Sequence, residues 1–244
     1  MILLELFCGT NLIGKQFPGE VISLDIAGES PTHQVNILGW DYSVYPRNHF
    51  TMIWASPPWT MYSKARNNAK TPRDLEGADR LVQAAIDIIF WFTPQYWFME
   101  NPWSGLLRHR AVVEHLPSPK KVSYCKYGFP YQKHTAVWTN TDIEFPVCSK
   151  DCDAIVPGTK RHRGTALQGR SKCNTPGYPL NMLHSLPPKL CQFICEFIAE
   201  LETQANASNR ECVRGIELPR GGPVGETSEE SGHTIYQETN TTVN

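Results

Sequence analysis

Gly9 and Asp25 are the first residues whose types and positions could do chemistry. Gly9 follows an apolar run and, because it has no side chain, it lets a ligand approach the backbone closely. Asp25 ends the run 20–25, and a carboxylate at a strand end can accept hydrogen bonds from both hydroxyls of a ribose. The two residues therefore predict a nucleoside cofactor site. A plain turn at Gly9 and a helix cap at Asp25 explain them equally well.

A second candidate is the segment 53–63, Ile-Trp-Ala-Ser-Pro-Pro-Trp-Thr-Met-Tyr-Ser, in which two prolines follow an apolar run. The prolines stop the hydrogen-bond ladder and hold the chain extended. The next residue, Trp59, is therefore expected to be presented rather than buried. This position raises the question of what Trp59 does there.

A third candidate is a set of possible metal ligands. Cys148, Cys152, His162 and Cys173 could supply four tetrahedral zinc ligands, and a gap of three residues between the first two cysteines is tolerated. The long gap before the lone Cys173 is not that of a standard zinc finger, and cysteines in reducing compartments are often free. Unliganded thiols are the default interpretation, and no metal is assigned.

Strands must position these residues. Apolar runs at 2–7, 20–25, 34–38, 50–55 and 96–100 predict five of them, and two later strands are predicted at 121–125 and 135–139. Short helices between the early runs, such as 12–17, favour a parallel sheet. The carboxyl ends of parallel strands meet at one edge, which would gather Gly9, Asp25, Trp59 and Glu100.

Two longer helices are predicted. Thr71 can cap a helix that begins at Pro72, and apolar residues then recur at helical spacing until Pro94 ends it, giving a helix over about 72–93. A last helix begins after 186 and ends near Glu202. Residues 141–186 lack a clear period and predict an irregular insertion that would face nucleic acid, and the composition of 203–244 predicts a disordered tail.

Composition limits the class of protein. The chain has 244 residues, 41% of them hydrophobic, which is enough for one main core. Its first residues lack the pattern of a secretory signal, and no apolar run is long enough to span a membrane. The eight cysteines therefore read as reduced thiols, and a soluble intracellular protein, in nucleus or cytoplasm, is expected. Basic residues are concentrated in 150–172, a patch that suits phosphates but is also typical of a solvated surface.

The order of the motifs is more specific than any single one. The segments concerned are Phe7-Cys-Gly-Thr10, Asp25-Ile26, Asn36 to Tyr42, Ser56-Pro-Pro58, Glu100-Asn-Pro102 and Tyr127 to Tyr131. This series resembles the cytosine-5 DNA methyltransferases, most of all their compact members in phages and large DNA viruses. The resemblance covers about residues 2–200. It implies an α/β class I S-adenosylmethionine-dependent fold, a Rossmann-like sheet with helices on both faces, within a domain at 1–202.

The resemblance also implies roles for individual residues. Phe7, Cys8, Gly9 and Thr10 would line the methionine part of S-adenosylmethionine, Asp25 and Ile26 the ribose and adenine edge, and Asn36 the adenine amine. The family usually has aspartate at position 36, and the Asn36 carbonyl oxygen could still accept from that amine. Glu100 would contact the ring nitrogen and exocyclic amine of the target base. DNA is the implied partner, RNA stays open, a viral or phage origin fits, and a monomer is expected.

Two departures from the family bear on catalysis. The family has a cysteine after the two prolines, whose thiolate adds to carbon 6 of a flipped cytosine, and the indole of Trp59 cannot form that bond. At Gln132-Lys-His134 the family generally has two arginines that hold and activate the base. His134 is at least as well explained by a structural hydrogen bond. Neither Cys8 nor Cys125 is expected to replace the missing thiol.

Ser56-Pro-Pro-Trp59 also resembles the motif of methyltransferases that act on exocyclic amines. In that motif a first polar residue and a backbone carbonyl accept from the amine, and an aromatic residue stacks on the flipped base. The catalytic set would then be Ser56, Pro57, Pro58, Trp59 and Glu100, with transfer to cytosine N4 or adenine N6. The alternative is an inactive relative that binds nucleic acid or cofactor, in which Trp59 only fills the vacated space.

Overall fold

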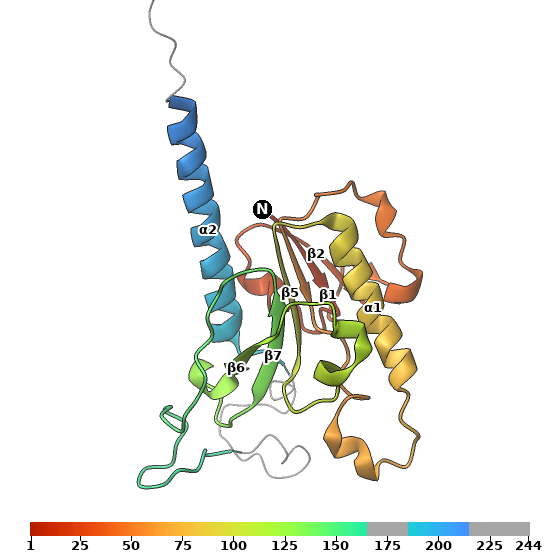
Figure 1. The fold of residues 1–244 in the computed structure, drawn as a ribbon, viewed down its shortest axis with the longest axis vertical. Helices are drawn as coiled ribbons and strands as arrows, with labels where there is room; N and C mark the ends of the chain where they lie inside the picture. The colour runs from red at the N-terminus through yellow and green to blue at the C-terminus, as the bar shows by residue number, and fades with distance from the viewer. Residues whose placement is uncertain (165–184, 215–244) are drawn as a thin grey trace, which may run out of the picture. The chain divides into compact units, whose positions relative to one another are not determined.

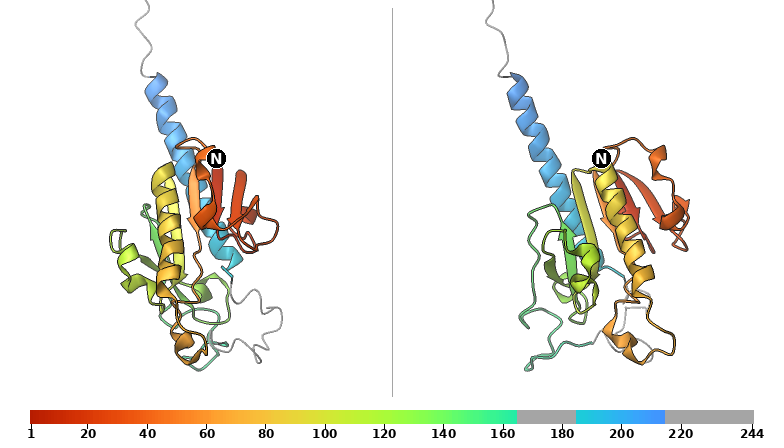
Figure 2. Two further views of the ribbon diagram at one scale, coloured as in Figure 1. Left: turned by 90° about the vertical axis from the view of Figure 1, so that its right-hand side faces the viewer. Right: turned by 45° about the vertical axis from the view of Figure 1, so that its right-hand side comes forward.

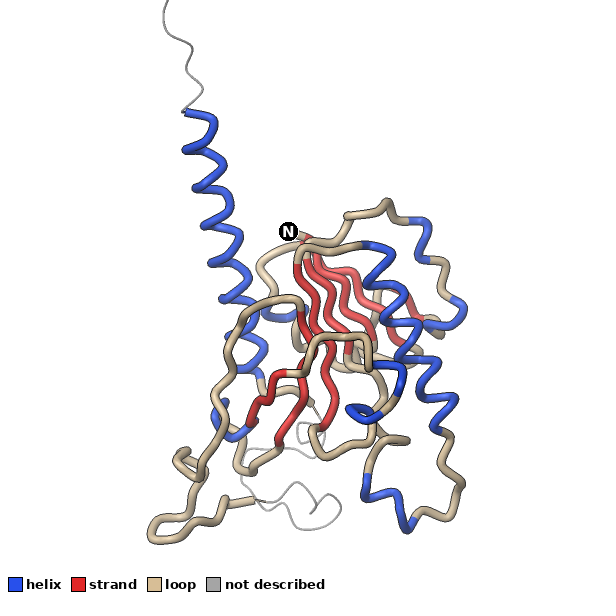
Figure 3. The backbone as a smooth tube through the Cα atoms, viewed as in Figure 1, coloured by secondary structure: helices blue, strands red, loops and turns tan. Residues whose placement is uncertain are grey.

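The computed structural model describes residues 1–164 and 185–214, without the side chains of residue 68 and residues 208–214. Seven strands form one mixed sheet in the order β3-β2-β1-β4-β5-β7-β6, drawn as arrows in Figure 1 and as red tubes in Figure 3. The strands are β1 (Ile2–Leu6), β2 (Glu20–Asp25), β3 (His33–Gln34), β4 (Met52–Ala55), β5 (Tyr96–Pro102), β6 (Lys120–Ser123) and β7 (His134–Thr139). The first five are parallel to one another, and β7 runs antiparallel to both of its neighbours.

The strand order reverses between β1 and β4. From β1 the chain adds β2 and β3 on one side, and then returns to place β4 against the other side of β1. In open α/β sheets the carboxyl ends of the strands at such a switch point form the usual ligand site. The loops at this edge are 7–13 after β1 and 56–63 after β4, so two of the candidate segments meet there.

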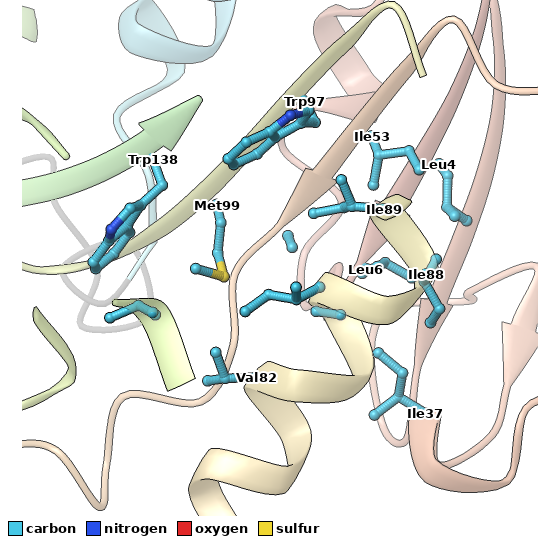
Figure 4. Close-up of a cluster of buried hydrophobic side chains, with 14 of the residues drawn as sticks. Leu4, Leu6, Ile37, Ile53, Val82, Ile88, Ile89, Trp97, Met99 and Trp138 are labelled. Atoms are coloured by element: carbon cyan, nitrogen blue, oxygen red, sulfur yellow. The ribbon is translucent and has the colours of Figure 1, made fainter. Parts of the chain in front are cut away.

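Helices cover both faces of the sheet (Figure 2). On one face, α1 (Leu75–Phe92) contributes Val82 and Ile89 to the buried cluster that also holds Leu4 and Ile53, part of which Figure 4 shows. The other face packs against the first part of α2 (Pro188–Arg214), whose members of the cluster are Leu190, Cys191, Ile194, Cys195 and Ile198. Because neighbouring strand residues point to opposite faces, Leu3 and Leu4 belong to different clusters.

Several element boundaries differ from the sequence predictions. Helix α1 begins at Leu75 rather than Pro72, because Asp74 is the cap: its Oδ1 accepts from the Gly77 backbone N–H at 2.7 Å. The run 34–38 gives only the two-residue β3 and a short 3-10 turn. The last helix continues past Glu202 to Arg214, so residues 203–214 are helical rather than disordered. Residues 215–244 lie outside the described part.

The remaining regular elements are 3-10 turns. They are η1 (Gly14–Gln16), η2 (Ile37–Gly39), η3 (Tyr42–Val44), η4 (Lys64–Asn68), η5 (Leu107–His109), η6 (Ala111–Val113) and η7 (Tyr124–Tyr127). Cys125 lies in η7, between β6 and β7, and not on a strand as predicted. Over residues 1–164 and 185–214, no helix is long and apolar enough to cross a membrane.

Candidate active site

Glu5 of β1 holds the loop after β1 through hydrogen bonds to its backbone. The Glu5 carboxylate is 3% exposed and accepts from the backbone N–H groups of Ile13 at 3.4 Å and Gly14 at 2.8 Å. Burial raises the pKa of Glu5 to about 7, while the two hydrogen bonds oppose the shift. Above it, Gly9 has a φ of 51°, and a Cβ at this position would meet nothing within 4 Å. The Gly9 backbone therefore faces open space at the sheet edge.

Asp25 fixes the loop after β1 to the loop after β2. Its Oδ2 accepts from the Gly9 N–H and its Oδ1 from the Ala27 N–H, each at 2.9 Å. The Glu29 N–H in turn donates to the Gly9 carbonyl oxygen at 2.7 Å. Gly28 is required here, because a Cβ would lie 2.9 Å from the Gly9 oxygen. Asp25 and Gly9 thus lie together as predicted, and Asp25 builds the turn in addition to any contact with a ligand.

The predicted adenine contacts lie beside this turn. The Val35 N–H donates to the Asp25 carbonyl oxygen at 3.1 Å, which places the end of β3 next to Asp25. Asn36 is exposed, and its Oδ1 caps η2 by accepting from the Leu38 N–H at 3.0 Å. Because an amide oxygen has two lone pairs, one stays available for an amine. Ile26 is 65% exposed and presents an apolar surface at the same edge.

Cys8 is the predicted cofactor residue that the structure turns inward. Its side chain is only 6% exposed. Burial, with the nearby carboxylates of Asp25 and Glu5, raises the pKa of the Cys8 thiol to about 11. A thiol in this state is a poor nucleophile at neutral pH.

The loop after β4 is tied down at each end. The Ser56 N–H donates to the Leu6 carbonyl oxygen at 3.2 Å, and the Ser56 hydroxyl accepts from the Trp54 indole N–H at 2.8 Å. The Pro57 carbonyl oxygen accepts from the Asn101 side-chain amide at 3.0 Å. Both oxygens that the amine-methyltransferase motif would use are thus held in place by protein donors, and each keeps a second lone pair.

Trp59 lies on the braced turn that follows. The Tyr62 N–H donates to the Trp59 carbonyl oxygen at 3.0 Å, and the fully buried Tyr62 donates its hydroxyl to Asp79 of α1 at 2.8 Å. The Arg73 guanidinium donates to the Met61 carbonyl oxygen at 2.6 Å. Trp59 itself is 37% exposed. This exposure agrees with the presentation that the two prolines predict.

Glu100 lies in β5, two residues before the strand ends at Pro102, in a buried setting that the sequence motif did not indicate. It is 8% exposed, and its Oε1 accepts from the Tyr124 hydroxyl at 3.0 Å. Burial raises the pKa of Glu100, although Lys133 and the Tyr124 hydrogen bond oppose this. Burial lowers the pKa of Lys133, whose Nζ lies 4.5 Å from the centre of the Tyr124 ring. Lys133, which lies between Gln132 and His134, is thus the basic residue whose charge acts on Glu100.

Gln132 and His134 bind protein groups away from Glu100. The Gln132 side-chain amide donates to the Cys148 carbonyl oxygen at 3.1 Å. His134 Nδ1 lies 2.9 Å from the Ser123 hydroxyl oxygen, which also accepts from the Cys148 N–H at 2.9 Å. Both residues therefore hold the segment at Cys148, which agrees with the structural interpretation of His134.

The predicted metal ligands are brought together in part. Cys148, Cys152 and His162 lie in one cluster, and the fourth member is Cys125, which the sequence did not indicate as a ligand. Cys173 lies outside the described residues. A place inside this cluster also makes Cys125 a poor substitute for a thiol at position 59.

Comparisons with known proteins give one clear relative. No family model matches the chain. The chain is 33% identical to a "Probable DNA (cytosine-5)-methyltransferase" of Frog virus 3 (isolate Goorha) over 161 residues, which span 59% of this chain and 72% of the viral protein.

Two solved structures are also similar, at lower identity. A "putative DNA modification methyltransferase encoded within prophage" (E. coli) gives a TM-score of 0.43 at 14% identity, over 57% of this chain and 46% of that one. A methyltransferase of Entamoeba histolytica gives 0.40 at 12% identity, over 61% and 55%. The chain thus spans about half the length of each.

Proposed function

Because the chain belongs to the cytosine-5 DNA methyltransferase family, we propose that it methylates a base in DNA with S-adenosylmethionine as the methyl donor. Membership confirms the resemblance carried by the ordered motifs. The seven-stranded sheet with a helix on each face is the α/β class I fold that the resemblance implied.

The residues at the sheet edge fit the cofactor. Gly9 offers backbone in front of open space, Asp25 offers carboxylate lone pairs, and Ile26 offers an exposed apolar side chain beside Asn36. Phe7 and Thr10, which flank the Cys8-Gly9 turn, would border the methionine part. When bound, S-adenosylmethionine supplies an electrophilic methyl group.

The methyl acceptor that the chain supports best is an exocyclic amine, at cytosine N4 or adenine N6. Carbon-5 chemistry needs a thiolate at position 59, and neither the buried Cys8 nor the clustered Cys125 replaces it. The observation that carries the proposal is the pair of fixed acceptors, the Ser56 hydroxyl and the Pro57 carbonyl, on the loop that presents Trp59.

Each residue then has a defined task. Ser56 and Pro57 accept hydrogen bonds from the amine. These bonds orient the nitrogen lone pair out of conjugation with the base ring and toward the methyl group. Trp59 stacks on the flipped base and contributes roughly 1–3 kcal/mol by analogy with single-strand binding sites. Glu100, favoured in its protonated form by burial, can donate to a ring nitrogen. In the transfer a bond from the amine nitrogen to the methyl carbon would form as the methyl–sulfur bond breaks, leaving S-adenosylhomocysteine, and the proton lost by the amine would pass to water.

The second candidate is a non-catalytic member that keeps the fold and binds DNA or cofactor without turnover. The observation in its favour is that Trp59 replaces the family's nucleophile while Gln132 and His134 bind protein groups.

The test is a nucleoside digest. Duplex DNA is incubated with isotopically labelled S-adenosylmethionine and the full chain, and the modified nucleoside is identified by mass, with an RNA substrate in parallel. Labelled 4-methylcytosine or 6-methyladenine is the expected result. Labelled 5-methylcytosine would refute the role of Trp59. Cofactor binding by calorimetry without any transfer would favour the non-catalytic candidate.

A matched variant separates the two methyl-transfer mechanisms. Trp59→Cys restores the family's thiol on the same braced turn. If the remaining residues still hold a cytosine, this variant should lose the amine activity and form a covalent adduct with DNA that contains 5-fluorocytosine. Trp59→Ser removes the ring without adding a strong nucleophile, and it should form no adduct.

A further inference from the structure

The cluster of Cys125, Cys148, Cys152 and His162 lies apart from the residues proposed to hold cofactor and base. Its four ligand atoms all lie within 4.8 Å of one another. Within the described part of the chain, this is the one group of histidine, cysteine or acidic side chains with such geometry. The four residues come from two segments, η7 and the loop 148–162, so the fold must bring them together.

The distances suit a tetrahedral metal ion. His162 Nε2 lies 3.5 Å from Cys148 Sγ and 3.4 Å from Cys152 Sγ. With Zn–S near 2.3 Å and Zn–N near 2.0–2.1 Å, neighbouring ligand atoms of a tetrahedral zinc are about 3.6–3.8 Å apart. Three thiols and one imidazole are also the donor set of a closed structural site. No large movement of side chains is needed to place the ion.

The surroundings support bound thiolates. The Lys150 N–H donates to Cys148 Sγ at 3.2 Å, and Lys150 adopts a φ of 70° that turns the chain between the two cysteines. Backbone donors to ligand sulfur are typical of metal sites, where they stabilise the thiolate. Lys126 and Asp151 form an ion pair at 2.8 Å that joins the two segments next to their cysteines.

We infer that Cys125, Cys148, Cys152 and His162 bind one structural Zn²⁺, which fastens the loop 148–162 to the turn between β6 and β7. The hydrogen bonds from Gln132 and to Ser123 already hold Cys148 at this turn, so the loop is placed for the ion. The site is closed, because all four positions are occupied by protein groups, and it has no role as a Lewis acid.

The ion would affect the proposed function by fixing the position of the basic loop. Cys125 follows Tyr124, which hydrogen-bonds Glu100. The loop carries the exposed residues Lys160 and Arg161, and the exposed Arg163 directly follows it. Metal binding would therefore hold a basic surface at a fixed place beside the turn between β6 and β7. This consequence depends on the proposed function, whereas the metal site itself does not.

The experiment measures metal in the full chain. The protein is produced in zinc-supplemented medium, purified without chelators, and analysed by elemental mass spectrometry, with about one zinc per chain as the expected result. Cobalt added to the reduced, metal-free chain should give the visible absorption of a tetrahedral thiolate complex. Zinc should then abolish that absorption.

Variants identify the ligands. Cys125→Ser, Cys152→Ser and His162→Ala should each lower zinc affinity by tenfold or more. Three matched controls, Cys173→Ser, Cys212→Ser and His109→Ala, should retain one zinc. Retention by Cys125→Ser with loss by Cys173→Ser would overturn the proposed fourth ligand. Circular dichroism of each variant separates loss of metal from loss of fold.

Other results would overturn the site itself. These are zinc below background with no cobalt absorption, iron in place of zinc, or a disulfide between two of the clustered cysteines in the freshly purified chain. Because none of these measurements uses methyl transfer, failure of the proposed activity would leave the metal result intact.

Discussion

The Asn101 side-chain amide donates a hydrogen bond to the Pro57 carbonyl oxygen at 3.0 Å, and it does so from a position that is 1% exposed. Asn101 directly follows Glu100 near the end of β5, whereas Pro57 lies in the loop after β4. One buried bond therefore fixes the distance between the proposed amine acceptors and the proposed base contact.

The first prediction removes this bond. Asn101→Ala should destabilise the fold by about 1–3 kcal/mol, because it leaves a buried carbonyl without its donor. It should also slow methyl transfer by about tenfold or more. Asn140→Ala is the matched control, since Asn140 bonds the Trp97 N–H and the Gln95 oxygen near the other end of β5. Urea unfolding and single-turnover kinetics distinguish them: an equal rate loss in both variants would mean that stability alone is responsible.

The second prediction concerns Trp59 as a stacking residue. Trp59→Ala should weaken binding to DNA with an unpaired target base by roughly 1–3 kcal/mol, about 5- to 150-fold, whereas Trp59→Phe should retain most of the affinity. The measurement is titration of duplexes that carry 2-aminopurine at the target position. Phe90→Ala, which removes a 51% exposed ring from α1, is the control. Unchanged binding by Trp59→Ala would exclude stacking.

Features that depend on neighbouring residues could be predicted from the sequence. The order of short motifs predicts the family, and short apolar runs predict the strands, because both signals are local. The presentation of Trp59 follows from two prolines for the same reason. The cap at Asp74 shows the limit of a local rule: Thr71 and Pro72 form a valid helix start, yet a stronger acceptor three residues before Gly77 is used instead.

The parts that sequence reasoning missed depend on contacts between distant segments. Cys125 meets Cys148 only because η7 packs against the loop after β7, and nothing in the residues around Cys125 signals that contact. The sequence motif around Gln132 and His134 did not indicate a role for Lys133. Lys133 acts on the pKa of Glu100 only because Glu100 is buried, and a sequence motif does not report burial.

The third prediction is a pH dependence of stability that arises from Glu5. Its pKa in the fold is about 7, raised by burial from an ordinary 4.5. A raised carboxyl pKa favours the fold fully below about pH 4.5, and this contribution is lost as the pH rises towards 7, by about 3 kcal/mol in total. Glu5→Gln stays neutral and should flatten this part of the curve. Urea unfolding from pH 4.5 to 7.5 measures it.

The control for Glu5 is the exposed Glu20, at the start of β2. Glu20→Gln should keep the wild-type slope of unfolding free energy against pH. A wild-type slope in Glu5→Gln would show that other groups cause the dependence. A lower stability of Glu5→Gln at every pH is compatible with the prediction, because Ile13 and Gly14 donate to two different carboxylate oxygens and an amide offers only one oxygen.

The fourth prediction tests the basic loop as a DNA contact. Lys160, Arg161 and Arg163 are exposed on the segment that the proposed metal site fastens. Each phosphate contact contributes about 0.9 to the slope of log affinity against log salt concentration, so the triple glutamine variant should lower the slope by up to about 3. Arg80→Gln, which removes an exposed charge on α1, is the control and should leave the slope unchanged. If the triple variant keeps the wild-type slope on a nonspecific duplex, these residues form a solvated surface and DNA contacts the protein elsewhere.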